Sequence, residues 1–148
     1  MSLVTGSLTA DGAVIDVLIG VSQNRRQRLL SVGFALPAEV VLRAQIDTGS
    51  YITGLIPAAF DQLGLQPFRV VPVRTPSTTP DKPCYCEMFD VSLTLLSGMT
   101  RMDIPSVHVI ASADFQREEN VQAIIGRDIL NCCVFTYAGP HSTFSLAF

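Results

Sequence analysis

The sequence predicts an all-β domain of mainly antiparallel strands, folded into a compact barrel with two short helices. Short apolar segments recur along the 148 residues, and turns rich in Gly, Pro or Asp separate them. The clearest alternation of apolar and polar residues runs from Cys84 to Leu96. One face of that strand would carry Tyr85, Glu87, Phe89, Val91, Leu93 and Leu95. A chain of this length fits one domain, residues 1–148.

The N-terminal part, residues 1–40, is expected to be an elaboration made of strands. Its first two apolar stretches are parted by Asp11-Gly12, and Asp-Gly between such stretches favours a hairpin. Residues 22–28 are polar and basic and predict a loop. The strands expected up to the middle of the chain span residues 3–8, 13–19, 29–34 and 39–46.

Helix signals appear after residue 56. Pro57 can begin a short helix that runs to Leu63 and ends at Gly64, and a second short helix begins at Arg127. Residues 112–120 are polar and predict a solvated loop. The remaining strands are expected at residues 68–73 (an edge strand, since it contains proline), 84–96, 102–111, 121–126, 133–137 and 142–148.

Composition limits the class of protein. Charged residues make up only 16% of the chain and hydrophobic residues 48%, which favours apolar surface hidden in an oligomer. The alternating Phe144, Leu146 and Phe148 would be exposed on a monomer, so we expect the C-terminal strand to form a dimer interface. A net charge of −3 argues against nucleic acid as a partner. No apolar run reaches the ~18 residues of a membrane span.

The four cysteines form a C-x-C pair, Cys84 and Cys86, and a C-C pair, Cys132 and Cys133. Residues this close in sequence disfavour bonding to one another, and no C-x-x-C spacing indicates zinc. The same spacings disfavour a cysteine-based redox or metal protein. Together with the lack of a secretory signal pattern, they predict reduced thiols in a cytoplasmic protein.

The candidate active-site segment runs from Val41 to Pro57. Here an apolar strand leads directly into Asp47, and apolar residues return after four positions. Thr48 offers a short hydroxyl, and Gly49 lets the backbone approach another group closely. Such a half-buried carboxylate suits proton transfer. The alternative is an ordinary turn in which Asp caps its own backbone.

A second motif lies between Val121 and Leu130. Two isoleucines there precede Gly126, Arg127 and Asp128. By itself this pattern indicates only a buried strand that runs into a helix.

Taken in this order, the two motifs resemble the signatures of the retropepsin-like (retroviral-type) aspartic proteases. Residues 56–65 also resemble the segment that follows the catalytic turn in bacterial single-domain members. The resemblance covers most of the span from Val41 to Phe148. It implies a single-lobe closed barrel that is active as a homodimer, without metal or cofactor.

The resemblance also implies roles for individual residues. Asp47 would be catalytic, with one copy from each of two identical subunits activating a water that cleaves an extended peptide or protein substrate. In the family the Thr at position 48 bonds across the twofold axis, and the hydroxyl at position 50 can steady the Asp. The residues that would support the active-site loop are Thr48, Gly49, Ser50, Ile125, Gly126 and Arg127.

Two departures from the family's pattern stand out. Retroviral members pair the Arg of the second motif with an acid, but that position holds Tyr51 here, so Arg127 is expected to brace either a backbone carbonyl or the neighbourhood of Asp128. The segment at residues 75–83 lies where the family has its flap, the hairpin that closes over substrate. It contains three prolines and no glycine, which predicts a stiff flap. Substrate contacts there would come from Thr75, Ser77, Thr78 and Thr79.

These observations predict an aspartic endopeptidase. The alternative is a non-catalytic dimeric module with the same fold that binds an extended peptide without cleaving it. An intact Asp-Thr-Gly-Ser favours the enzyme, whereas the flap and Tyr51 favour the module.

Overall fold

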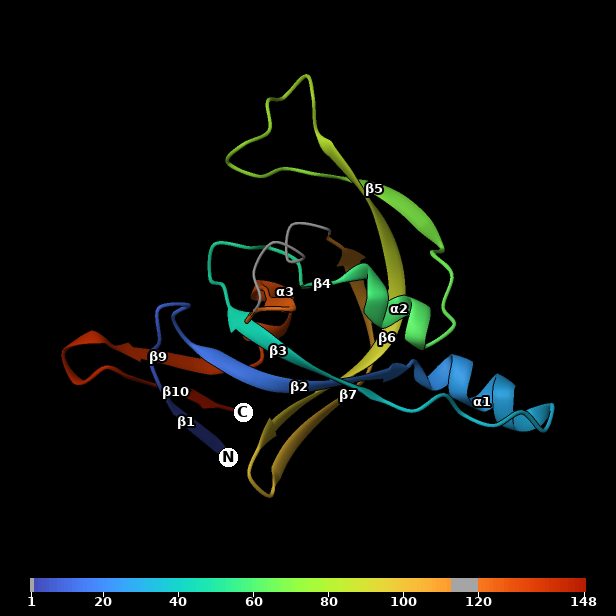
Figure 1. The fold of residues 1–148 in the computed structure, drawn as a ribbon, viewed down its shortest axis with the longest axis horizontal. Helices are drawn as coiled ribbons and strands as arrows, with labels where there is room; N and C mark the ends of the chain where they lie inside the picture. The colour runs from blue at the N-terminus through green and yellow to red at the C-terminus, as the bar shows by residue number, and fades with distance from the viewer. Residues whose placement is uncertain (1, 113–119) are drawn as a thin grey trace.

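A computed structural model of the chain describes residues 2–112 and 120–148 (Figure 1). Its strands are β1 (Leu3–Ser7), β2 (Val14–Val21), β3 (Val40–Ile46), β4 (Gly54–Leu55), β5 (Arg69–Val73), β6 (Cys84–Ser97), β7 (Thr100–Ala111), β8 (Ala123–Ile125), β9 (Val134–Ala138) and β10 (Thr143–Ala147). Its helices are α1 (Gln23–Ser31), α2 (Pro57–Gln62), α3 (Arg127–Leu130) and the short 3₁₀ turn η2 (Gly139–His141).

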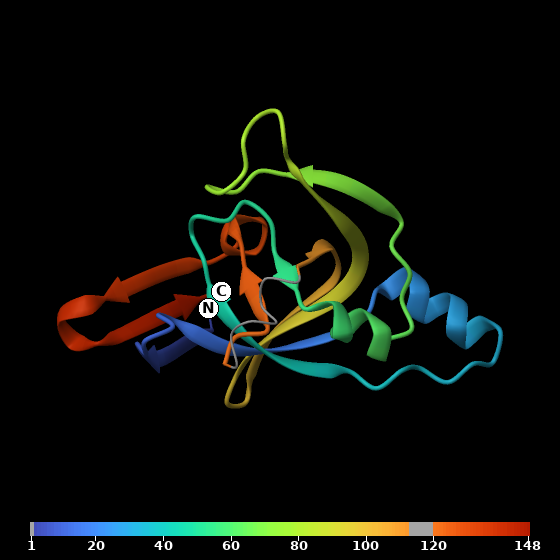
Figure 2. The same ribbon diagram turned by 45° about the horizontal axis from the view of Figure 1, so that its top comes forward.

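The larger sheet closes into a barrel. Its seven strands lie in the order β2-β3-β8-β4-β7-β6-β5, and β2 also pairs with β6. The second pairing joins the two sides of the sheet into a closed six-stranded barrel, with β5 as an extra edge strand on β6. Figure 2 shows the β5–β6 hairpin rising out of this barrel and curving back over it. The predicted all-β barrel is therefore confirmed.

Alternation along the long strands builds the core. On β6, Val91, Leu93 and Leu95 of the predicted face are fully buried, whereas Tyr85 and Glu87 near its start are exposed. On β2, Val17 and Ile19 are fully buried. Helix α2 closes one end of the core by stacking the ring of Phe60 on that of Phe89, with ring centroids 3.8 Å apart. Strand β2 pairs with two barrel strands and contributes buried side chains, so it is one of the strands that form the barrel.

A smaller sheet contains both ends of the chain. Its order is β1-β10-β9, so the C-terminal strand β10 lies in the middle. Phe144 and Leu146 of that strand are 3% and 0% exposed within the chain itself. The expectation that they are exposed for a dimer interface is therefore wrong, because both side chains pack into the hydrophobic core of the chain, and β1 and β9 pair with the two edges of β10. The strands with a free edge in this sheet are β1 and β9.

The predicted N-terminal hairpin is also wrong. Asp11 and Gly12 do form a tight turn, with Thr9 and Gly12 bonded in both directions at 2.9–3.0 Å. Beyond the turn, β1 pairs with β10 and β2 pairs with β3 and β6. The local turn signal was real, but β1 pairs with a strand more than a hundred residues away, and β2 pairs with strands further along the chain instead of with β1.

Residues 22–34 differ from the prediction of a loop followed by a strand. They form helix α1 and its C-terminal cap, in which the N–H groups of Gly33 and Phe34 donate to the carbonyls of Leu30 and Leu29 at 3.1 and 2.9 Å. Gly33 has a φ of +77° there. Gln, Arg and Leu favour helix, but no residue of α1 is buried, so the helix lacks the apolar period on which the prediction depended.

Other elements follow the prediction closely. Helix α2 begins at Pro57, and Gly64 ends it with a φ of +62°. The proline-containing strand β5 is an edge strand, and Gly98 turns between β6 and β7. The predicted loop at residues 112–120 lies almost entirely outside the described residues.

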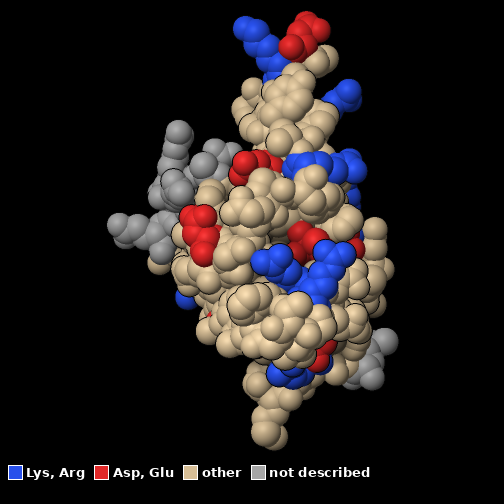
Figure 3. Space-filling view, turned by 90° about the vertical axis from the view of Figure 1, so that its right-hand side faces the viewer, with Lys and Arg blue, Asp and Glu red and all other residues tan. Residues whose placement is uncertain are grey.

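The surface and helices add two observations. On the face that looks out from the right-hand side of Figure 1, basic side chains lie in small groups with acidic ones between them (Figure 3). Among the residues that the structure describes, no helix is long and apolar enough to cross a membrane.

Candidate active site

Asp47 lies at the point where β3 leaves the barrel. The strand before it is anchored by the buried Ile46, and the N–H of Asp47 donates to the carbonyl of Ile125 at 3.0 Å. Its carboxylate Oδ1 accepts the N–H of Gly49 at 2.9 Å, and its carbonyl accepts the N–H of Ser50 at 3.2 Å. The capping turn and the buried strand are thus both present. The result is a half-buried carboxylate in a fixed orientation.

Strand β8 places the second motif beside this turn. It pairs in parallel with β3, with Ile125 opposite Ile46, and antiparallel with β4 on its other side. The strands before and after the Asp47 turn, β3 and β4, therefore lie on opposite sides of β8. At the end of β8, a Cβ on Gly126 would lie 2.6 Å from the carbonyl carbon of Ile52, so this crossing requires glycine.

Arg127 braces the active-site turn through backbone carbonyls, which is one of the two kinds of partner expected from the sequence. Its Nη1 donates to the carbonyl of Thr48 at 2.9 Å and to that of Gly49 at 3.3 Å. Its backbone N–H donates to the carbonyl of Ser50 at 2.9 Å. A single arginine thus joins three consecutive carbonyls of the turn.

Two functional candidates were not singled out from the sequence, Thr53 and Asp128. The Asp128 carboxylate accepts the N–H and the hydroxyl of Thr53 at 2.9 and 2.8 Å, and the N–H of Ile129 at 2.9 Å. The fully buried Thr53 hydroxyl in turn accepts the N–H of Gly126 at 3.1 Å. One signal could have pointed to this network: a threonine inside an otherwise apolar run needs a partner when it is buried.

The Ser50 hydroxyl does not contact the Asp47 carboxylate. It donates instead to the carbonyl of Ile52 at 2.7 Å, so the expectation that it steadies the aspartate is wrong for the chain as described. The local reason is the tight turn, which leaves the Gly49 N–H, not the hydroxyl, beside Oδ1. The neighbouring Tyr51 keeps 47% of its surface exposed.

A cleft of about 640 Å³ lies above Asp47. One wall is the active-site turn, the opposite wall is the loop end of the β5–β6 hairpin, and the end of β7 forms part of the floor. Among the described residues that line the cleft, Asp47 is the single acid, and most of the others are apolar. The lining residues are Gln45, Asp47, Gly49, Ser50, Tyr51, Pro57, Val73, Arg74, Thr75, Pro76, Cys84, Tyr85, Cys86, Ile110, Ala111, Ser112 and Ile124.

Of the predicted flap contacts, Thr75 lines the cleft, whereas Ser77, Thr78 and Thr79 do not. The loop is held by its own side chains. The Thr78 hydroxyl donates to the carbonyl of Thr75 and accepts its N–H, both at 2.9 Å. The hydroxyls of Thr75 and Ser77 lie 2.9 Å apart. These bonds, together with the prolines, give the loop a fixed shape.

A second hollow of about 360 Å³ lies on the other side of Asp47. Asp47 and Thr48 share it with Phe135 and Tyr137 of β9. Asp47 is therefore placed between the substrate-sized cleft and the side of the molecule where β9 has a free edge.

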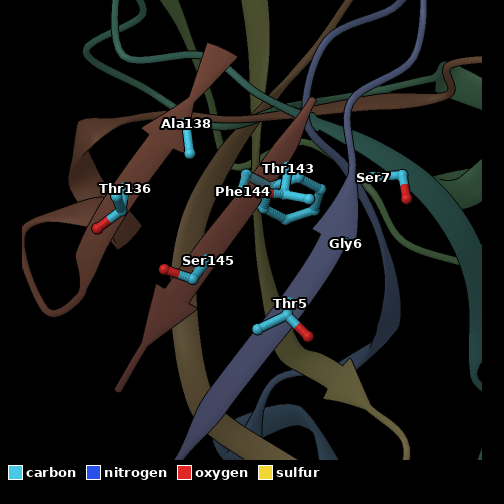
Figure 4. A pocket seen from close by; sticks show the side chains of 8 residues that line it. All are labelled: Thr5, Gly6, Ser7, Thr136, Ala138, Thr143, Phe144 and Ser145. Carbon is cyan, nitrogen blue, oxygen red and sulfur yellow. The ribbon is translucent and has the colours of Figure 1, made fainter. Parts of the chain in front are cut away.

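A third hollow, about 460 Å³, lies on the terminal sheet (Figure 4). Its side chains are short and uncharged apart from the ring of Phe144, which fills the space above Gly6. The lining residues are Thr5, Gly6, Ser7, Thr136, Ala138, Thr143, Phe144 and Ser145. The lining has hydroxyl groups but, among the described residues, no His, Asp, Glu, Lys or Cys that could activate them.

Within the described ranges, no group of three or more His, Cys, Asp or Glu side chains is placed to hold a metal ion. The described residues provide one oriented carboxylate in a cleft of about 640 Å³.

No model of a protein family matches the sequence, and no curated protein matches it. Solved structures do match. A retropepsin-like aspartic protease from Rickettsia conorii superposes with a TM-score of 0.57 at 12% identity, over 99% of this chain and 91% of that one. EIAV protease in complex with the inhibitor HBY-793 gives a TM-score of 0.41 at 18% identity, over 81% and 86% of the two chains. The retroviral protease-like domain of Ddi1 from Leishmania major gives 0.41 at 13% identity, over 89% and 86%. The first match shows that this chain has the retropepsin-like fold.

Proposed function

We propose that the protein is an aspartic endopeptidase in which Asp47 is the catalytic residue. The observation that carries the proposal is the placement of Asp47. Its carboxylate is oriented by the Gly49 N–H and stands in the cleft beneath an overhanging hairpin. The retropepsin-like fold supports the same conclusion.

Catalysis of this kind needs a second carboxylate. One aspartate must be ionised to take a proton from water, and another must be protonated to polarise the peptide carbonyl. Among the described residues that line the cleft Asp47 is the single acid, and the sequence has one Asp-Thr-Gly motif, so we propose that the second acid comes from another copy of the chain. A twofold axis beside Asp47 would supply it.

The surface around Asp47 supports such a pairing. Thr48 and Gly49 are exposed, and the adjacent strand β9 has a free edge. On that strand Val134 and Tyr137 keep 60% and 61% of their surfaces exposed. We therefore place the dimer interface on this side, with β1 and β9, rather than β10, as the strands available to the partner.

In the proposed mechanism the peptide lies extended in the cleft, between the hairpin and the strands of the floor. A water held between the two Asp47 carboxylates attacks the peptide carbonyl as one carboxylate accepts its proton, and the other carboxylate protonates the carbonyl oxygen. Arg127 acts as a positioning residue, because it holds the carbonyls on either side of Gly49. Apolar lining favours hydrophobic side chains in the substrate.

The test is cleavage of a peptide library by the wild type and by Asp47→Asn, each with and without a transition-state inhibitor of aspartic peptidases. We expect cleavage by the wild type alone, blocked by the inhibitor. Peptide binding without any cleavage would favour the non-catalytic module, which the stiff flap and Tyr51 support. Cleavage by Asp47→Asn at the wild-type rate would refute the assignment. Bacterial origin, a cytoplasmic location and the single-domain organisation stay predictions.

A further inference from the structure

The inner face of the β5–β6 hairpin carries two thiols. Cys84 pairs with Val73 and Cys86 pairs with Val71 across the antiparallel ladder. Directly paired residues point to the same face of a sheet. Val73 lines the cleft, and Val71 and Val73 are 6–8% exposed, so the two cysteines share the face of the hairpin that turns toward the cleft. Both cysteines line the same cavity as Asp47.

The sulfur atoms of Cys84 and Cys86 lie 3.8 Å apart. Sequence spacing suggested that residues so close would not bond, but the pleat of a strand places residues two apart side by side on one face. Cys84 is exposed at the mouth of the cleft, where a small reagent can reach it. We propose that Cys84 and Cys86 form a reversible redox site, in which oxidation by a peroxide joins them in a disulfide and alters the substrate cleft.

The chemistry balances with hydrogen peroxide as the oxidant. The Cys84 thiolate attacks a peroxide oxygen, an S–O bond forms as the O–O bond breaks, and hydroxide leaves and takes up a proton as water. The Cys86 thiolate then attacks the sulfenic sulfur, the S–S bond forms as the S–O bond breaks, and a second water leaves. The two thiols give up two electrons in total, and the peroxide accepts them.

Formation of the bond would move the flap. Residues two apart in an extended strand have Cα atoms about 6.6 Å apart, near the upper limit of roughly 6.8 Å for a disulfide. The strand must therefore contract at Cys84, which is the first residue of β6 and forms the last pair of the hairpin ladder with Val73. The loop at residues 74–83 begins at that pair, so contraction displaces the loop that overhangs Asp47.

The chain contains its own comparison pair, Cys132 and Cys133. These neighbours follow α3 and do not line the cleft. Cys133 is half-buried, and its thiol lies 3.7 Å from the carbonyl of Ile129. Burial raises the pKa of Cys133 and the adjacent Cys132 raises it further, so less of it is thiolate near neutral pH. Slower reaction is expected at this pair.

The experiment uses the full chain with C132S and C133S, so that Cys84 and Cys86 are the remaining cysteines. Graded hydrogen peroxide is added, and the intact mass is measured before and after dithiothreitol. We expect loss of the mass of two hydrogens, reversed by the reductant, without a crosslinked dimer on a non-reducing gel. Adding C84S to this background should abolish the two-hydrogen loss and leave a single sulfenic acid that dimedone traps.

Two further measurements, hydrogen exchange and peptide cleavage, accompany the mass measurement. Hydrogen exchange across residues 71–86 should increase on oxidation, because the end of the ladder opens. Peptide cleavage, relative to the same chain when reduced, should fall by roughly tenfold or more, because a misplacement of about 1 Å can cost on the order of a hundredfold in rate. Dithiothreitol should restore both.

The cleavage effect rests on the proposed peptidase function, whereas the mass and exchange readouts do not. If the reduced chain cleaves no peptide, the proposed function fails, and the other two readouts still decide the redox site. A crosslink between subunits, no two-hydrogen loss, or a disulfide that leaves hydrogen exchange and the cleavage of an active chain unchanged would each overturn the proposal.

Discussion

Thr53 and Asp128 form a two-pronged hydrogen bond that joins the active-site turn to helix α3. Oδ2 of Asp128 accepts the Thr53 N–H at 2.9 Å, and Oδ1 accepts the Thr53 hydroxyl at 2.8 Å. Because that hydroxyl also accepts the Gly126 N–H, it connects both motifs of the site in one buried network. These two residues lie 75 positions apart, so the network fixes one motif against the other.

Thr53→Val should be strongly destabilising. It keeps the shape of the side chain but leaves the buried Gly126 N–H without its acceptor, which costs about 1–3 kcal/mol. Thr53→Ser is the matched control, because it keeps the hydroxyl and loses only a methyl group, at about 1 kcal/mol. Urea unfolding of the two variants measures the difference. Equal stabilities would mean that the hydroxyl does not support the site.

Gly126→Ala should disrupt the crossing of the two chain segments. The added carbon would lie 2.6 Å from the carbonyl carbon and 2.7 Å from the carbonyl oxygen of Ile52, which is backbone and cannot rotate away. We expect a loss of about 3 kcal/mol in the free energy of unfolding. Gly139→Ala is the control, since its nearest neighbour, in Tyr137, would be at an ordinary 3.5 Å. Similar thermal midpoints for both variants would contradict the crowding argument.

Arg127→Ala should reduce activity more than stability. The exposed guanidinium holds the carbonyls of Thr48 and Gly49, so its loss loosens the turn that aims Asp47. We expect kcat to fall on the order of a hundredfold with a smaller change in KM, because orientation matters most at the chemical step. Arg127→Lys should recover part of the loss, and Arg28→Ala on the exposed helix α1 serves as the control. If kcat falls in both Arg127 variants only in proportion to their loss of unfolding free energy, the residue has a purely structural role.

Replacing Ser77-Thr78 with Gly-Gly tests the flap. The change removes the hydroxyl of Thr78, which bonds the N–H and carbonyl of Thr75, and so frees the loop. We expect faster turnover on generic peptides with little change in the melting temperature, because the loop adds little to the core. Unchanged cleavage together with a large loss of stability would show that the loop supports the fold instead.

Local patterns predicted the parts of the site that lie within one segment. The strand before Asp47 and the segment from β8 to Arg127 were predicted correctly, because a run of apolar residues indicates a buried strand. In both segments a glycine after the run marks the place where the strand ends. For each of these strands the signal and the structure lie within a few residues of each other. The brace from Arg127 joins residues 79 positions apart, and the absence of an acid at Tyr51 left two partners open, of which the structure shows the backbone carbonyls.

Contacts between distant segments could not be predicted in the same way. The pairing of β1 with β10 joins the two ends of the chain, and the Asp11-Gly12 turn gave no information about it. Helix α1 was predicted wrongly as a loop and a strand, because a helix with no buried residue has no apolar periodicity to detect. The burial of Phe144 likewise depends on distant segments, because its side chain packs into the hydrophobic core of the chain.

The most direct test of the account mixes wild-type and Asp47→Asn subunits. The two chains are refolded together in equal amounts at constant total concentration, and peptide cleavage is measured against the wild type alone. If each active site needs one Asp47 from each of two copies, only wild-type pairs are active, and activity should fall to about one quarter. Activity of about one half, in proportion to the wild-type chains, would show that each copy works alone and would contradict the shared active site.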